Sequence, residues 1–312
     1  MRKVIITGVS SFVGMHLVEA FCEAGWGVIA VTSKPARAYD GIRAERLERI
    51  KHLVTFEVCD LTDATAVRLL VEEAKPQLWV QHAGFAQNYA SADYDLATSF
   101  AVNVTPLKAL YEALNKVGAC CIITGSSAEY SASQDANRED DACWPDTPYG
   151  LSKLAETLEA RRLSDFYRVP TRVARLYIPV GPMDAPGKLM DHVIMQLKNN
   201  EPVDLSPCLQ KRDFVSVKDI TLAYVKLADD MARKPFDIFN ICSGEARELK
   251  NLLIDLCQIS DRPESLLNFG AFPMRMGEPM VSYGSNDKAC ELLDWQPSAL
   301  SHVLEGLIHG KT

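Results

Sequence analysis

Tyr149 and Lys153 are the residues whose types and spacing first suggest chemistry. On a helix, residues four apart lie on one face, so the two side chains can meet. A lysine ammonium beside a phenol favours the phenolate, and we expect it to lower the pKa of Tyr149 from about 10 toward neutrality. Such a phenol can exchange a proton with a carbonyl or alcohol oxygen. The same spacing also arises by chance on amphipathic helices, so the surrounding elements must decide between the two interpretations.

The N-terminal segment has the pattern of a dinucleotide-binding turn. Residues 3–7 are a short apolar run typical of a buried parallel strand, and residues 15–24 have helical periodicity. Between them, residues 8–14 have the spacing G-x-x-G-x-x-G, with Ser11 in the place of the middle glycine. Strand, turn and helix in this order let the backbone approach a pyrophosphate whose charge the helix N-terminus stabilises. The Ser11 side chain either crowds the phosphates or hydrogen-bonds one of them.

The residues after the second expected strand, 27–31, indicate which dinucleotide would bind. NAD-binding sheets usually carry a carboxylate there, which binds the ribose 2′-hydroxyl. Here the segment is Thr32-Ser33-Lys34, with Arg37 close behind. Because this segment has no carboxylate, it would not repel a 2′-phosphate, and its two cations could pair with one. The pattern favours NADP over NAD, and a solvated loop with ordinary charges is the alternative.

Further apolar runs complete a pattern of strands that alternate with helices. Strands are expected at 53–58, 77–81 and 119–124, and helices at 41–52, 64–73 and, as one long helix, 95–117. This alternation predicts an α/β fold with a parallel, doubly wound, Rossmann-like sheet, whose ligands bind at the carboxyl ends of the strands. Ser126 and Tyr149 both fall at that edge.

The regular pattern ends near residue 177, where prolines and glycines mark a long loop. We expect a dinucleotide-binding domain formed by residues 1–176 and 213–243, with a strand returning to the sheet near 239–241. Residues 177–212 and 244–312 would form a smaller C-terminal substrate-binding lobe.

Composition excludes several classes of protein. A net charge of -8 argues against a nucleic-acid-binding protein. The nine cysteines are scattered without a Cys-x-x-Cys pair, which argues against disulfides and a zinc site and for a reducing compartment. No apolar run is long enough to span a membrane, and the N-terminus lacks the pattern of a signal peptide. We therefore expect a cytoplasmic protein with no metal site, in which His82 is a satisfied histidine at the end of a strand.

With these motifs in order along nearly the whole chain, the sequence resembles the extended short-chain dehydrogenase/reductases. Within them it is similar to the NAD(P)-dependent epimerase/dehydratase group that acts on nucleotide sugars. The motifs that carry the resemblance are Thr7 with residues 8–14, Asp60-Leu61, His82-Ala83-Gly84, Asn103-Val104, Ser126-Ser127 with Tyr130, Tyr149 with Lys153, residues 212–215, residues 275–279 and residues 293–297.

The resemblance implies a role for each motif. Tyr149 would be the acid/base, Lys153 would lower its pKa and hold the nicotinamide ribose, and Ser126 would hydrogen-bond the substrate oxygen. Asn103 would support Lys153 through water. The expected cofactor-binding residues are Gly8, Ser10, Ser11, Phe12, Val13, Gly14, Thr32, Ser33, Lys34, Arg37, Asp60, Leu61, His82, Ala83, Gly84, Asn103, Tyr149 and Lys153. The expected substrate-binding residues are Ser126, Ser127, Ala128, Arg212 and Arg275, of which the two arginines would contact the diphosphate.

Departures from the family's motifs narrow the reaction. The family's dehydratases have a carboxylate just after the catalytic hydroxyl, where this chain has Ser127 and Ala128, and Glu129 comes one residue late. The double epimerase-reductases have a cysteine at the Ala128 position and a histidine where Met183 stands. Two reactions remain, namely reduction of a 4-keto-6-deoxy nucleotide sugar with NADPH and carbon 4 epimerisation with tightly bound NAD.

The expected preference for NADP and the segment 125–130, which is similar to that of 6-deoxyhexose reductases, favour the reductase. Ile178 replaces the family's asparagine, which leaves the usual substrate contact in doubt. A non-catalytic NADP sensor and a reductase of lipophilic ketones are the other hypotheses. The family also suggests a homodimer that pairs residues 95–117 and 149–166 into a four-helix bundle.

Overall fold

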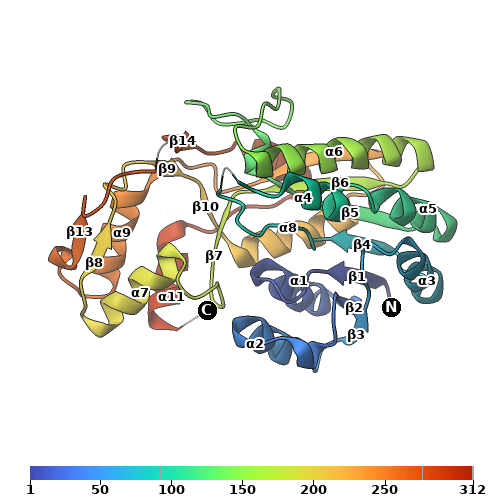
Figure 1. Ribbon diagram of the computed structural model, residues 1–312, viewed down its shortest axis with the longest axis horizontal. Coiled ribbons are helices and arrows are strands. Elements are labelled where there is room, and N and C mark those ends of the chain that lie inside the picture. The colour runs from blue at the N-terminus through green and yellow to red at the C-terminus, as the bar shows by residue number, and fades with distance from the viewer. Residues whose placement is uncertain (92, 276, 311–312) are drawn as a thin grey trace.

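A seven-stranded parallel sheet forms the centre of the molecule in the computed structural model, which describes residues 1–91, 93–275 and 277–310 (Figure 1). The strand order is β11-β6-β5-β4-β1-β2-β3, so the order reverses between β1 and β4. A reversal of this kind leaves a crevice at the carboxyl ends of the strands, where ligands bind. The strands are β1 (Lys3–Thr7), β2 (Gly27–Thr32), β3 (Thr55–Val58), β4 (Leu78–Gln81), β5 (Cys120–Ser126), β6 (Thr171–Leu176) and β11 (Phe236–Ile241).

Helices cover both faces of this sheet because its central strands are apolar on both sides. In β1, Val4 and Ile6 belong to one core while Ile5 belongs to the other. The first core contains residues of α1 (Phe12–Glu23), α2 (Gly41–Ile50), α8 (Val217–Asp229) and α10 (Asp287–Leu293). The second contains residues of α3 (Ala64–Ala74), α5 (Leu107–Val117) and α6 (Pro148–Tyr167), and α4 (Leu96–Asn103) lies against α6. The predicted doubly wound, Rossmann-like sheet is confirmed, including the returning strand at β11.

The predicted single helix at 95–117 is wrong. The chain forms α4 and α5 as separate helices, and Pro106 is the residue that precedes α5. Proline lacks a backbone N–H and disfavours a helical residue before it, so the helix has to restart there. The break places Asn103 at the last position of α4.

A third core belongs to a smaller lobe, on the left in Figure 1. It is built on α7 (Leu189–Asn199), α9 (Leu249–Ile259) and α11 (Leu300–His309), with the strand pair β8 (Val203–Leu205) and β13 (Leu267–Phe269). A short sheet of β9 (Lys211–Arg212), β12 (Arg247–Glu248) and β14 (Val281–Ser282) lies beside it, and β7 (Ile178–Val180) pairs with β10 (Phe214–Ser216). The division of the chain into a dinucleotide-binding domain and a substrate-binding lobe stays a prediction. No helix within the described residues has the length and apolar character to cross a membrane.

A buried ion pair links β6 to the end of α8. The guanidinium of Arg172 is fully buried, and its Nε lies 2.7 Å from Oδ2 of Asp230. The neighbouring Asp229 instead pairs with Arg2 at the surface, at 2.6 Å. The two adjacent aspartates therefore form a matched comparison of a buried and an exposed pair.

We predict that Asp230→Asn lowers the free energy of unfolding by about 3 kcal/mol, because it leaves the Arg172 charge buried without its counter-charge. Asp229→Asn should change it within experimental error, since an exposed pair contributes little. Denaturant unfolding of both variants checks this, and equal losses would contradict the assignment.

Candidate active site

The three predicted catalytic residues meet at the carboxyl edge of the sheet. Ser126 is the last residue of β5, and Tyr149 and Lys153 lie in the first turns of α6. This helix starts where the sequence provides for it, since the Thr147 side chain accepts a hydrogen bond from the N–H of Gly150 at 3.0 Å. A Cβ on Gly150 would lie 2.0 Å from the carbonyl oxygen of Ala128. Only glycine lets α6 approach the Ser126 segment this closely.

Burial controls the protonation of the tyrosine. It raises the pKa of Tyr149 above its ordinary value, while the Lys153 ammonium and the Ser126 hydroxyl act in the opposite direction. The expected phenol tuned toward neutrality is therefore wrong, because desolvation outweighs the neighbouring charge. The rings of Tyr89 and Tyr94 pack around Tyr149, at centroid distances of 5.6 and 5.8 Å.

Glu156 is a site residue that sequence reasoning missed. Its buried carboxylate forms an ion pair with Lys153, one turn earlier on α6. Burial alone would lower the pKa of Lys153, but Glu156 and Tyr149 raise it, so the side chain stays an ammonium. The i, i+3 spacing of a lysine and a glutamate could have indicated the pair.

Glu129 lies in the 3-10 turn η2 (Ser127–Glu129) and is also fully buried. One carboxylate oxygen accepts the backbone N–H of Ser126 at 2.8 Å, and the other accepts from Nε of Arg175 at 2.9 Å. The Ser126 hydroxyl accepts from the N–H of Ala128 at 3.2 Å. Glu129 thus holds the Ser126 segment in place and is directed into the protein interior, which is consistent with its exclusion as a dehydratase acid or base.

Asn103 ties the loop after β4 to α6. Its Oδ1 accepts the N–H of Phe85 at 2.7 Å, and its Nδ2 donates to Oγ of Ser152 at 3.2 Å. Because Ser152 precedes Lys153, this buried amide fixes the turn of α6 that carries the lysine. The water-mediated support of Lys153 stays a prediction.

The glycine turn packs against the loop after β4. Gly8 has φ +72, and a Cβ there would lie 2.8 Å from the N atom of Ala83. Ser11 caps α1, accepting the N–H of Gly14 at 3.0 Å. The first N–H groups of a helix have no partner within it, so the start of α1, at Phe12 and Val13, suits a pyrophosphate. The turn and the predicted loop residues 82–84 are thus brought together, which fits a dinucleotide.

His82 lies between two hydroxyl groups, as expected for a satisfied histidine. Its Nδ1 is 3.0 Å from Oγ1 of Thr124, and its Nε2 is 3.0 Å from Oγ of Ser11. Burial, with a smaller effect of the Lys153 charge, lowers the pKa of His82 to about 4. The imidazole is therefore neutral at physiological pH.

The residues expected at the 2′-phosphate divide into two groups. Ser33, Lys34 and Arg37 are exposed after β2, and the Lys34 ammonium lies 4.7 Å from the ring centroid of Tyr39. Thr32 is buried instead. In the loop after β3, Asp60 accepts two hydrogen bonds from Thr62, which lower its pKa. Leu61 packs against the second core.

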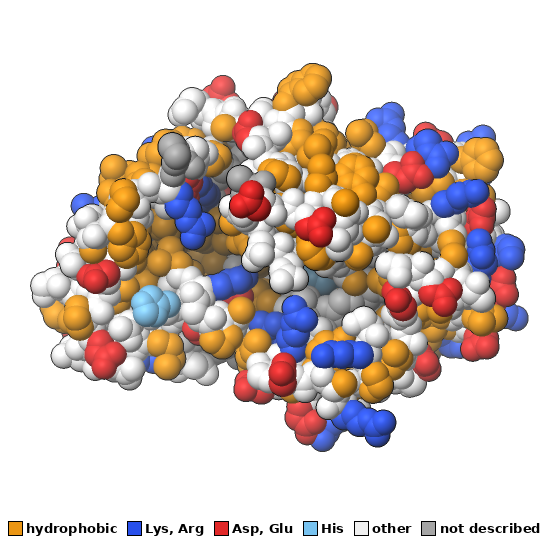
Figure 2. All heavy atoms as spheres, in the orientation of Figure 1, with side chains coloured by type: hydrophobic (Ala, Val, Ile, Leu, Met, Phe, Trp, Pro, Cys, Tyr) orange, Lys and Arg blue, Asp and Glu red, His pale blue; other side chains and the backbone are white. Residues whose placement is uncertain are grey.

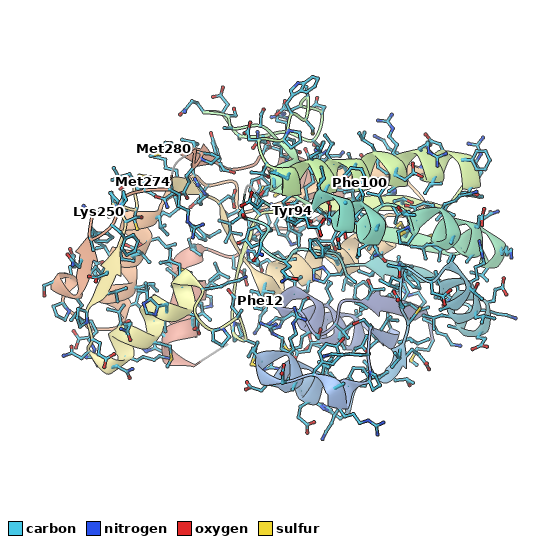
Figure 3. The ribbon with its side chains drawn as sticks, viewed as in Figure 1. Phe12, Tyr94, Phe100, Lys250, Met274 and Met280 are labelled. Atoms are coloured by element: carbon cyan, nitrogen blue, oxygen red, sulfur yellow. The ribbon has the colours of Figure 1, made fainter. Side chains whose placement is uncertain are left out.

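The two predicted substrate arginines lie on the lobe. Arg212 is bound through Nη2 to Oε1 of Glu278, at 2.9 Å, and burial lowers its pKa. Arg275 is exposed on the same segment as Glu278. Figure 2 shows the molecule hollowed between the lobe and the sheet, with basic side chains beside the hollow. In Figure 3, Phe12 and Tyr94 lie on the sheet side, and Lys250, Met274 and Met280 lie on the lobe.

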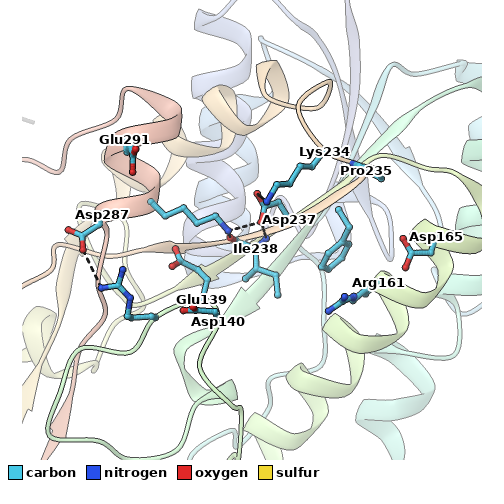
Figure 4. Close-up of a pocket in the computed structure, with 13 residues that line it drawn as sticks. Glu139, Asp140, Arg161, Asp165, Lys234, Pro235, Asp237, Ile238, Asp287 and Glu291 are labelled. Carbon is cyan, nitrogen blue, oxygen red and sulfur yellow. Dashed lines mark hydrogen bonds and ion pairs between the residues drawn. The ribbon is translucent and has the colours of Figure 1, made fainter.

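A cavity of about 630 Å³ lies elsewhere, along the outer edge of β11 (Figure 4). Charged side chains of both signs line it, and Asp237 is bound there by Lys288 at 2.6 Å. The N–H of Asn240 donates to Glu139 at 2.9 Å, and Lys288 donates to the carbonyl of Ile238 at 2.7 Å. None of the predicted catalytic or cofactor residues lines this cavity, so it is not the candidate active site.

We predict that His82 makes the folded protein less stable as the pH falls. Its folded-state pKa lies below the ordinary value of about 6.5, so unfolding takes up a proton between pH 6.5 and 4. The contribution of His82 to the free energy of unfolding is therefore fully present above pH 6.5 and declines below it, by about 2 kcal/mol at pH 5. His82→Gln should remove this decline, whereas His52→Gln, at an exposed histidine, should retain it. Denaturant unfolding at pH 7 and pH 5 measures the difference, and an unchanged pH dependence in His82→Gln would contradict the prediction.

Comparison with known proteins identifies the family. Residues 4–242 match the NAD dependent epimerase/dehydratase family. CDP-abequose synthase of Salmonella muenchen is 24% identical over 306 residues, which cover 94% of this chain and 92% of that protein. dTDP-4-dehydro-6-deoxyglucose reductase of Escherichia coli is 24% identical over 265 residues, which cover 80% and 79%.

Among solved structures, UDP-glucuronic acid 4-epimerase from Bacillus cereus, in complex with UDP-glucuronic acid and NAD, has the same fold. The TM-score is 0.83 at 21% identity, covering 99% of this chain and 100% of that one. The predicted family, near the deoxysugar reductases, and the predicted class of NAD(P)-dependent enzyme are confirmed. Because the family match covers most of the chain, the chain belongs to the NAD dependent epimerase/dehydratase family.

Proposed function

We propose that the protein is an NADPH-dependent reductase of a 4-keto-6-deoxy nucleotide sugar. The observation that carries the proposal is the grouping of Ser126, Tyr149 and Lys153 at one edge of the sheet, with Glu129 directed away from it. With a bound nicotinamide as hydride donor, these side chains would suffice to deliver the proton, and dehydration would need a further acid or base. The relatives that carry the names CDP-abequose synthase and dTDP-4-dehydro-6-deoxyglucose reductase support a deoxysugar nucleotide as substrate.

The protonation of the site supports the direction of reaction. Burial keeps Tyr149 a phenol, which can donate its proton to a carbonyl oxygen as a ketone is reduced. Ser126 would hydrogen-bond the same oxygen, and Lys153 would stabilise the phenolate that remains. Bound NADPH would supply the hydride, held by Lys153, Asn103 and the residues of the glycine turn.

The proposed preference for NADP rests on charge. Lys34 and Arg37 are exposed cations after β2, where no carboxylate stands. Arginine and lysine both form charge-assisted hydrogen bonds with phosphate. Arg212 and Arg275 would serve the substrate diphosphate in the same way, and Arg212 would have to share its charge between the diphosphate and Glu278.

A carbon 4 epimerase with tightly bound NAD is the second candidate. It would use the same three residues, and the similar structure from Bacillus cereus is a 4-epimerase in complex with NAD. An epimerase first oxidises its substrate, which needs Tyr149 as a base. The same tyrosine would then act as the acid when the keto intermediate is reduced, so the exposed cations Lys34 and Arg37 are the observation that favours the reductase.

We further propose a cytoplasmic homodimer. The nine cysteines are all free thiols, which suits a reducing compartment. On α6, Leu151, Leu158 and Phe166 are exposed, and apolar side chains along one helix suit a four-helix bundle between two copies.

We predict that the protein oxidises NADPH when a 4-keto-6-deoxy nucleotide sugar is added. Tyr149→Phe should lower kcat by about 10²- to 10⁴-fold, because it removes the proton donor, and should change the Kd of NADPH far less, because the other expected cofactor contacts remain. Tyr167→Phe, on the same helix, is the matched control and should keep full activity, since that hydroxyl donates to Glu112. The loss of nicotinamide absorbance measures the rate. Absence of oxidation across a panel of such sugars would reject the reductase, and NAD that co-purifies without net redox change would select the epimerase.

We also predict that Lys34→Ala with Arg37→Ala raises the Kd of NADPH at least about tenfold, the cost of one lost charge-assisted hydrogen bond. The Kd of NADH should stay constant, because NADH has no 2′-phosphate. Arg43→Ala, at another exposed arginine nearby, should change neither value. An equal loss for both cofactors would show that these cations act through the fold.

A further inference from the structure

A chain of hydrogen bonds joins α8 to the glycine turn across the sheet. The hydroxyl of Tyr224 lies 2.7 Å from Oγ1 of Thr124. His82 continues the chain, 3.0 Å from Thr124 on one ring nitrogen and 3.0 Å from the Ser11 hydroxyl on the other. Ser11 is the serine that replaces the middle glycine of the turn. The chain therefore ends where the sequence departs from the glycine pattern.

Counting donors and acceptors gives this chain a direction. Tyr224 is completely buried, and burial raises its pKa, so it remains a phenol with one hydrogen to donate. The partner of that hydroxyl among the described residues is Thr124. If Tyr224 donates to Thr124, the hydrogen of Thr124 is directed to Nδ1 of His82.

The direction passes through the histidine. A neutral imidazole that accepts a hydrogen bond at Nδ1 carries its proton on Nε2. Nε2–H then donates to Oγ of Ser11, which also accepts the N–H of Gly14 at 3.0 Å. Both acceptor positions of the hydroxyl are occupied, so its own hydrogen points away from the chain.

We propose that this chain fixes the Ser11 hydroxyl as a hydrogen-bond donor to the cofactor pyrophosphate, with His82, Thr124 and Tyr224 as positioning residues. The inference rests on the proposed dinucleotide function. Ser11 precedes α1, where an anion is stabilised, and is not fully buried. Of the two alternatives that the sequence leaves open for the Ser11 side chain, crowding the phosphates or hydrogen-bonding one of them, the proposal selects the hydrogen bond.

The close packing of the turn supports the proposal. Because Gly8 lies against Ala83, the loop after β4 brings His82 within reach of Ser11. A hydroxyl of fixed direction loses little freedom on binding a phosphate, so the bond contributes more to affinity than a freely rotating one.

The tautomer of His82 is the first test. Nitrogen NMR of protein with labelled histidine, with the His82 signals assigned from their loss in His82→Gln, should show the proton on Nε2, with and without NADPH. A proton on Nδ1 would overturn the proposal, since Ser11 would then donate to His82.

The affinity for NADPH, measured by its fluorescence, is the second test. Ser11→Ala should raise the Kd about tenfold, as expected for a hydrogen bond to a charged group. Tyr224→Phe, far from the turn, should raise it about threefold and increase the Nδ1–H tautomer. The double variant should bind as weakly as Ser11→Ala alone. Tyr111→Phe is the matched control, because Tyr111 is equally buried and its hydroxyl bonds Thr171 at 3.1 Å.

The outcomes separate the two proposals. A wild-type protein that binds neither NADPH nor NADH would reject the proposed function and this inference with it. If the wild type binds NADPH but Ser11→Ala or Tyr224→Phe behaves like Tyr111→Phe, the proposed function stands and the inference falls. Tyr224→Phe keeps the test valid if Ser11→Ala, which also loses the cap of α1, does not fold.

Discussion

The buried ion pair between Lys153 and Glu156 is the interaction on which the rest of the site depends. A charge removed from water is stable only with a partner, and Glu156 provides it within the same helix. The ammonium lowers the pKa of both Tyr149 and His82. At Tyr149 this counteracts the effect of burial, and at His82 it acts in the same direction as burial. One cation thus acts on the phenol of the candidate site and on a neutral ring beside the glycine turn.

The scaffold keeps these groups in place through a second buried ion pair. Glu129 accepts the backbone N–H of Ser126 at the end of β5 and pairs with Arg175, while the Ser126 hydroxyl acts on Tyr149 of α6. Gly150 then allows that helix to approach the same segment. The geometry of the candidate site is therefore set by rigid elements, since Ser126 ends a strand and Tyr149 and Lys153 lie in the first two turns of a helix.

Much of the fold could be predicted from the sequence because it depends on local patterns. Apolar runs marked the central strands, and the spacing of Tyr149 and Lys153 placed both on one face. The break at Pro106 was missed because the apolar pattern continues across it. The roles of Glu156 and Glu129 were missed because burial decides them. The bond between Thr124 and Tyr224 joins residues a hundred positions apart, and no periodicity in the sequence records such a pair.

The outer side of β11 has a consequence for the behaviour of the protein in concentrated solution. An unpaired strand edge invites another chain to add to the sheet, and this is a common route to aggregation. Here the carboxylate of Glu139 and the ammonium of Lys288 already occupy backbone groups of that edge. At the opposite side, β3 has only four residues. Charged side chains thus block strand addition at the β11 edge, and the short length of β3 disfavours it at the other edge. Both features reduce the tendency to form fibrous polymers.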